Sequence, residues 1–118
     1  MSKDELISHV QAMHFVGGSS GLAFAALLGS SEILTNKRTD ATTIVVILSD
    51  GKSEDPWDIA MAAGSSLKST GATVYALSYE PSAAERELME YTGTSDQVYI
   101  EDKASGFIDT FKASMCKW

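Results

Sequence analysis

The stretch TTIVVILSDGKS, residues 42–53, decides the fold of this chain. Its first part is an unbroken run of β-branched and aliphatic residues, and we expect a strand over residues 42–50. A strand that is apolar on both faces is typical of the interior of a parallel sheet. The polar residues SDGKS then end the strand in a turn. A strand of this kind needs helices over both of its faces.

Two helices are expected before this strand. Ser2 and Glu5 form a capping box in front of a helix over about residues 3–14. After a glycine-rich loop, a second helix is expected over about residues 20–34. Its apolar residues Leu22, Ala25, Ala26 and Ile33 share one face.

Strands and helices alternate after residue 53. Asp55 is suited to cap a helix that starts at Pro56 and ends near Ser69, before Gly71. Strands are then expected over residues 72–78 and 97–100. A helix between them opens with the capping box Ser82–Glu85 and ends near Gly93, and an apolar stripe marks a closing helix: Phe107, Ile108, Phe111 and Met115.

This alternation predicts an α/β fold, a three-layer, doubly wound and mostly parallel sheet with helices on both faces, in one domain over residues 1–118. In such sheets ligands bind beyond the carboxyl ends of the strands, where Asp50 and residues 78–80 stand. The most apolar strand lies at one edge of a narrow sheet, which is unusual. The sheet therefore looks incomplete, and we expect another strand or a second copy of the chain along residues 43–49.

Composition excludes several classes of function. The chain has a formal net charge of −7 and a pI of about 4.6, which opposes binding to nucleic acid or to anionic lipid. Its longest apolar stretch, residues 21–29, is too short to span a membrane, and residues 1–6 do not read as a signal peptide. Cys116 is the only cysteine, so no disulfide forms within the chain. We expect the methionines at positions 13, 61, 89 and 115 to fill the core.

The loop GGSSG, residues 17–21, admits four interpretations. It fits the G-x-S-x-G elbow of a serine hydrolase with Ser19 as nucleophile, but it lacks a preceding strand, and both histidines come before the serine. The second interpretation is a phosphate-binding loop, but GGSSG lacks the further glycine and the lysine that such a loop requires. A metal loop would combine Ser19 or Ser20 with Asp50, since Mg²⁺ and Mn²⁺ prefer hard oxygen ligands. The fourth interpretation is a packing turn whose serines cap the next helix.

Three segments carry a family resemblance: MHFVGGSSGLAF, then TTIVVILSDGKSEDPWDIAMAAGSSLKSTGATVYALSY, then ELMEYTGTSDQVYIED. In this order they resemble the C-terminal part of a von Willebrand factor type A domain. The family's first strand and its DxSxS loop are absent, and that strand would lie beside residues 43–49. In the family's metal-ion-dependent adhesion site, Asp50 would supply the carboxylate, and Ser19 or Ser20 would replace a threonine.

The resemblance implies an extracellular protein-binding or adhesion module rather than an enzyme; a cytoplasmic location is the alternative. A bound Mg²⁺ or Mn²⁺, held weakly by the remaining ligands, would receive an acidic side chain of the protein partner. The expected partner-contact residues are Gly17, Gly18, Gly51, Ser53 and Trp57. The alternative function is a metal-independent structural or self-associating module, a homo-oligomer that pairs through residues 43–49. A hydrolase that uses Ser19 is the weakest of the candidates.

Overall fold

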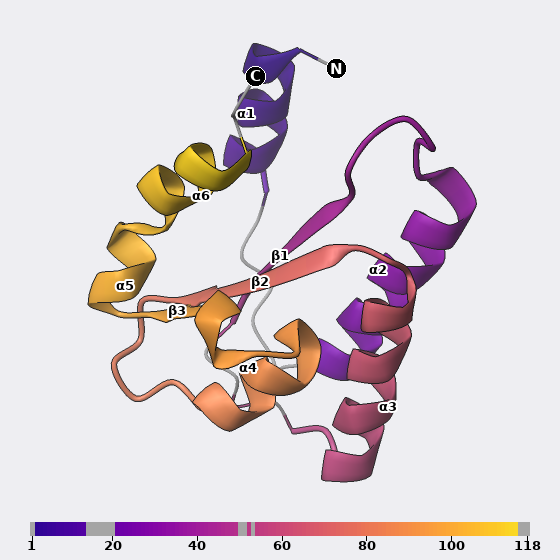
Figure 1. Cartoon of the computed structure of the whole chain (residues 1–118), viewed down its shortest axis with the longest axis vertical. Coiled ribbons are helices and arrows are strands. Elements are labelled where there is room, and N and C mark those ends of the chain that lie inside the picture. The colour runs from indigo at the N-terminus through magenta and orange to yellow at the C-terminus, as the bar shows by residue number, and fades with distance from the viewer. Residues whose placement is uncertain (1, 14–20, 50–51, 53, 116–118) are drawn as a thin grey trace.

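The computed structural model describes residues 2–13, 21–49, 52 and 54–115, and Figure 1 shows how its elements are arranged. A parallel sheet lies between two layers of helices, so the predicted α/β class and layering are confirmed. The helices and strands follow in chain order: α1 (Lys3–Gln11), α2 (Leu22–Asn36), β1 (Ile44–Leu48), α3 (Trp57–Ser69), β2 (Thr73–Ser78), α4 (Glu85–Thr92), the 3₁₀ turn η1 (Ser95–Gln97), β3 (Val98–Ile100), α5 (Asp102–Ser105) and α6 (Phe107–Met115).

The sheet has the order β1-β2-β3, and both strand pairs are parallel. Val46 of β1 lies beside Tyr75 of β2 in the register. A helix connects each strand to the next, as parallel strands require. The observed β1 is shorter than the predicted strand, although backbone hydrogen bonds to β2 extend as far as Thr43 and Ser49.

One face of the sheet is covered by α2, α3 and α4. The main core cluster on this face joins the three helices to β2, mostly through small and aliphatic side chains, so the helices approach the sheet closely. The largest fully buried side chains here are Leu67, Leu88 and Tyr91. The cluster under α2 and α3 consists of Ala23, Ala26, Ala60, Ala63, Leu67, Val74 and Tyr91.

The opposite face is covered by α5 and α6 over β2 and β3. The ring of Phe107 packs edge-on against Tyr75 at 5.4 Å and against Tyr99 at 5.0 Å between centroids. Phe111 also contacts Tyr75. The predicted apolar stripe is wrong at Ile108, which is 60% exposed, because α6 turns this side chain away from the aromatic cluster.

Local signals explain most of the helix ends. The Ser2 hydroxyl accepts a hydrogen bond from the Glu5 amide at 3.2 Å, as the capping box predicts. Gly71 takes the left-handed conformation after α3, with φ of +84°. The second capping box is wrong: α4 begins after Ala84 without a side-chain cap, because Ser82 bonds to other side chains.

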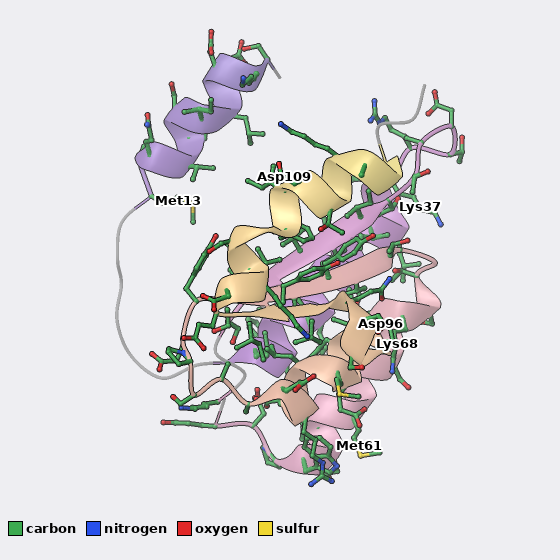
Figure 2. All side chains as sticks on the ribbon, turned by 60° about the vertical axis from the view of Figure 1, so that its left-hand side comes forward. Met13, Lys37, Met61, Lys68, Asp96 and Asp109 are labelled. Atoms are coloured by element: carbon green, nitrogen blue, oxygen red, sulfur yellow. The ribbon has the colours of Figure 1, made fainter. Side chains whose placement is uncertain are left out.

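Helix α1 stands apart from the sheet, as Figure 2 shows, and none of its residues is buried. Its apolar side chains therefore do not join the core.

The prediction that the methionines fill the core is wrong for Met13, Met61 and Met89, all of which are exposed. No helix in the described part of the chain combines the length and apolarity needed to cross a membrane.

Candidate functional site

Most of the residues predicted to form the site lie outside the described part of the chain: Gly17, Gly18, Ser19, Ser20, Asp50, Gly51 and Ser53. The structure does describe the residues that flank both loops. Helix α2 begins at Leu22, directly after the glycine-rich loop. The Ser49 amide donates to the Leu77 carbonyl oxygen at 3.3 Å, so strand pairing continues up to the residue before Asp50.

Asp55 links the flanks of the two loops. Its carboxylate oxygen Oδ2 accepts a hydrogen bond from the Ala23 amide at 2.9 Å. The first amides of a helix have no partner within the helix, and a carboxylate also suits the positive end of the helix dipole. The sequence predicted Asp55 as the cap of the helix that follows it. The structure shows that Asp55 caps α2 instead. Helix α3 begins at Trp57, and Pro56 occupies its N-cap position without a side-chain cap.

A chain of polar contacts lies beyond the carboxyl ends of β1 and β2. The Lys52 ammonium donates to the Ser82 hydroxyl at 2.6 Å, and that hydroxyl donates to the Glu80 carboxylate at 2.9 Å. The Glu80 amide in turn donates to the hydroxyl of buried Ser78 at 3.1 Å. These contacts join the segment after β1 to the segment after β2.

Trp57 lies at the start of α3 and is 37% exposed. The guanidinium carbon of Arg86, on α4, lies 4.4 Å from the centre of the indole ring. This cation–π contact holds one face of the ring and leaves part of it open to a partner. Trp57 is therefore partly exposed, and its role in binding stays a prediction.

The described residues contain no group of three or more His, Cys, Asp or Glu side chains arranged to hold a metal ion. The predicted ligands Asp50, Ser19 and Ser20 lie outside the described residues, so their role stays a prediction. One carboxylate with hydroxyls makes a weak site for a divalent cation.

An apolar groove of about 250 Å³ runs between α2 and the edge of β1. Val46 is 42% exposed and Leu48 is 74% exposed, although the sequence is that of a buried strand. Neither α5 nor α6 covers this part of the sheet. The groove is lined by Leu22, Ala25, Ala26, Gly29, Val45, Val46, Ile47, Leu48 and Leu67.

A larger hollow of about 400 Å³ lies at the amino ends of β1 and β2, between residues 37–43 and Thr70 and Gly71. The Lys37 ammonium donates to the Thr70 carbonyl oxygen at 3.4 Å there. In a parallel sheet this end lies opposite the carboxyl ends that carry the predicted loops. The hollow is therefore separate from the candidate site.

Replacing Asp55 tests the link between the loops. We expect Asp55→Ala to lower the free energy of unfolding by about 1–2 kcal/mol, because the Ala23 amide loses its charged partner. Asp55→Asn keeps an acceptor oxygen and should lose less. The measurement is urea unfolding followed by circular dichroism. Asp40→Ala, which removes an exposed carboxylate from a turn, should change the free energy by no more than about 0.5 kcal/mol. An equal loss in both alanine variants would contradict a specific role of Asp55.

Sequence reasoning missed the roles of Lys52, Glu80, Ser82 and Arg86. Each of them acts through a residue of another segment, so spacing along the chain carries no signal for the contact. One signal was present, because Lys52 lies within SDGKS, and residues 78–80 end a strand at the edge where ligands bind.

One comparison with known proteins finds a family whose fold agrees with this structure. The model of the von Willebrand factor type A domain family matches residues 1–113. A search of curated proteins finds no match. Since the family model covers nearly the whole chain, and the structure has the parallel sheet and flanking helices expected of it, the chain belongs to the von Willebrand factor type A domain family.

Proposed function

We propose that this chain binds a protein partner at the carboxyl ends of β1 and β2. The domains of this family are protein-interaction modules in general. The observation that carries the proposal is the hydrogen bond of 2.9 Å between Asp55 and the Ala23 amide. Ala23 follows the glycine-rich loop, and Asp55 follows the SDGKS loop. Their hydrogen bond therefore brings together the two segments that come directly after these loops. A partner that reaches one loop would also meet the other.

The proposal includes a weakly bound Mg²⁺ or Mn²⁺. Asp50 would supply the carboxylate, Ser19 or Ser20 would supply hydroxyl oxygens, and an acidic side chain of the partner would complete the site. Gly17, Gly18, Gly51 and Ser53 belong to the same two loops and would lie at the contact. Adhesion outside the cell is the setting that fits such a module.

Trp57 is the proposed apolar anchor of the contact. Partly exposed aromatic side chains contribute strongly to protein interfaces when a partner covers them. The Arg86 guanidinium restrains the ring at 4.4 Å, so less conformational entropy is lost on binding. Lys52 and Glu80 lie at the same end of the sheet and would form part of the polar rim.

A titration with Mn²⁺ tests the cation site directly. Mn²⁺ is paramagnetic and broadens the amide signals of nearby residues in nuclear magnetic resonance spectra. We expect saturable broadening at Leu22, Ala23 and Lys52 at millimolar Mn²⁺, and we expect Mg²⁺ to reverse it by competition. Asp50→Asn should abolish this broadening, because it removes the carboxylate.

Asp40→Asn is the matched control, since it removes the same charge from an exposed turn. It should leave the broadening unchanged. Broadening spread evenly over all acidic surfaces, or unchanged in Asp50→Asn, would exclude the proposed cation site. Partner binding that persists in the presence of a chelator would separate the protein contact from the metal.

The second candidate function is metal-independent self-association along residues 43–49. The exposure of Leu48, at 74%, and of Val46, at 42%, favours it. A protein with so apolar a surface strand gains free energy when a partner covers that strand.

A further inference from the structure

The hollow at the amino ends of β1 and β2 lies between two connections of the chain. One wall is the segment between α2 and β1, residues 37–43, and the other is Thr70 and Gly71 at the turn between α3 and β2. This turn leads into β2, which lies on the side of β1 away from the additional strand expected from the sequence. The volume of about 400 Å³ falls within the range of small-ligand pockets, roughly 300–1,000 Å³.

The hollow collects positive charge in an acidic chain. Lys37 and Arg38 both line it, and they are the only basic residues that are adjacent in a sequence with 9 basic and 16 acidic residues. Asp40, the acidic residue of the same connection, is not among the lining residues. The charge of the lining is therefore opposite in sign to the net charge of −7, and it suits an anionic ligand.

Several donors in this wall are available to a ligand. The Arg38 guanidinium and the hydroxyls of Thr39 and Thr42 form no hydrogen bond or ion pair with any other residue that the structure describes. All three residues are exposed. A guanidinium presents a planar fork of N–H donors that matches the oxygens of a phosphate group, and hydroxyls can donate to the same oxygens.

Helices α2 and α3 end beside the hollow, and a helix dipole carries partial negative charge at its carboxyl end. The last carbonyl groups of α3 are already hydrogen-bonded. The Leu67 carbonyl oxygen accepts from the Thr70 hydroxyl at 2.6 Å, and the Lys68 carbonyl oxygen accepts from the Gly71 amide at 3.3 Å. The Lys37 ammonium donates to the Thr70 carbonyl oxygen at 3.4 Å and keeps further N–H donors for a ligand. Repulsion between an anion and this helix end is therefore reduced.

The lining also indicates the class of the anion. A phosphate monoester carries a charge of about −1.5 to −2 at neutral pH, which balances Lys37 and Arg38 together, whereas a sulfate ester is a monoanion. The described lining has no aromatic side chain on which a nucleotide base could stack. The threonine hydroxyls of the same wall suit a hydroxylated molecule instead.

We propose that this hollow binds the phosphate group of a small hydroxylated molecule, such as a sugar phosphate. Lys37 and Arg38 are the charged contacts, and the hydroxyls of Thr39 and Thr42 donate to the phosphate or to the ligand's own hydroxyls. The site lies at the opposite end of the sheet from the proposed partner contact and the proposed cation, so the inference does not depend on either of them.

A titration with glucose 6-phosphate, followed by the amide signals in nuclear magnetic resonance spectra, tests the site. We expect saturable shifts at Thr39, Thr42 and Gly71 with a dissociation constant of about 1 mM, and no shifts with glucose. Glucose 6-sulfate should bind about fivefold or more weakly because it carries less charge. The absence of saturable shifts up to about 20 mM glucose 6-phosphate, or equal shifts with glucose, would overturn the proposal. Equal affinity for the sulfate ester would overturn the assignment to phosphate.

Variants of the two basic residues locate the binding. Arg38→Gln should raise the dissociation constant for glucose 6-phosphate about tenfold, because it removes a charged, forked donor. Lys37→Gln should also weaken binding, but it loses the bond to Thr70 as well, so Arg38→Gln is the decisive variant. Lys112→Gln removes the same charge from an exposed position on α6 and should leave the dissociation constant unchanged. Unchanged affinity in Arg38→Gln, or equal weakening in Lys112→Gln, would show that the hollow is not the binding site.

Discussion

Gly64→Ala is expected to lower the free energy of unfolding by about 2 kcal/mol, measured by urea denaturation. Gly64 is buried in α3, where this helix crosses α4. A Cβ atom at this position would meet the backbone carbonyl oxygen of Glu90, far inside van der Waals contact. The clash involves backbone rather than the end of a flexible side chain, so the two helices must move apart. This cost exceeds the gain of about 1 kcal/mol that alanine has over glycine within a helix.

Gly29→Ala is the matched control for this prediction. Gly29 lies within α2, and an added Cβ there meets no atom of the described residues within 4 Å. Its helix propensity gain is then unopposed, so we expect an increase in stability of up to about 1 kcal/mol. Equal effects of the two substitutions would contradict a close approach of α3 and α4. Because Leu67 and Tyr91 pack beside this crossing, a displaced α4 would also loosen the core.

The order and type of the principal elements could be predicted from the sequence. The run IVVIL has no polar position that could face water, and this identifies β1 as a strand of a parallel sheet. Helix α1 could be recognised by its capping box, and the end of α3 by Gly71. These signals are local, because each depends on residues within one turn of the chain. The short helix α5 carries no such signal and was not predicted.

Contacts between segments could not be predicted in the same way. Asp55 has the right position to cap α3, and it is also near enough in space to cap α2, but only the fold decides between these helices. Ser82 has the right spacing for a capping box, and the Lys52 ammonium bonds to it instead. The exposure of Met61 and Met89 depends on which side of α3 and α4 faces the sheet. In Figure 2, Met61 projects from α3 at the outside of the molecule.

The candidate site was predicted from its two loops, and the structure describes their flanks. The flanks of the two loops lie side by side because Asp55, in the segment between β1 and α3, bonds to the start of α2. The polar contacts through Glu80 require the second strand to lie beside the first, which the sequence predicted as a topology but without residue partners. The cation site is proposed because Asp50, Ser19 and Ser20 offer oxygen ligands, and the Mn²⁺ titration tests it.

Tyr91 is expected to make the chain unusually sensitive to alkaline pH. Its side chain is fully buried, and its hydroxyl has no hydrogen-bond partner among the described residues. Burial raises the pKa of Tyr91 from 10.0 to about 12, and the carboxylates of Glu87, Asp55 and Glu90 add to this effect. Between these two values the unfolded chain loses the phenolic proton while the folded chain keeps it. Ionisation therefore stabilises the unfolded state, and the stability that is present below pH 10 falls as the pH rises toward 12.

Tyr91→Phe isolates this contribution. The wild-type free energy of unfolding should fall by about 2–3 kcal/mol more than that of Tyr91→Phe between pH 9 and pH 12, as measured by urea denaturation. At pH 8 the variant should be at least as stable as the wild type, because it removes a buried hydroxyl that has no partner in the described part of the chain. Tyr79→Phe, at an exposed position, should leave the pH dependence unchanged. Parallel stability curves for the wild type and Tyr91→Phe would show that the hydroxyl reaches water or a polar partner.

Asp55 contributes to the raised pKa of Tyr91 and also caps α2, so Asp55→Ala should weaken the alkaline effect as well as the helix. The same carboxylate thus couples the core beneath α4 to the start of α2.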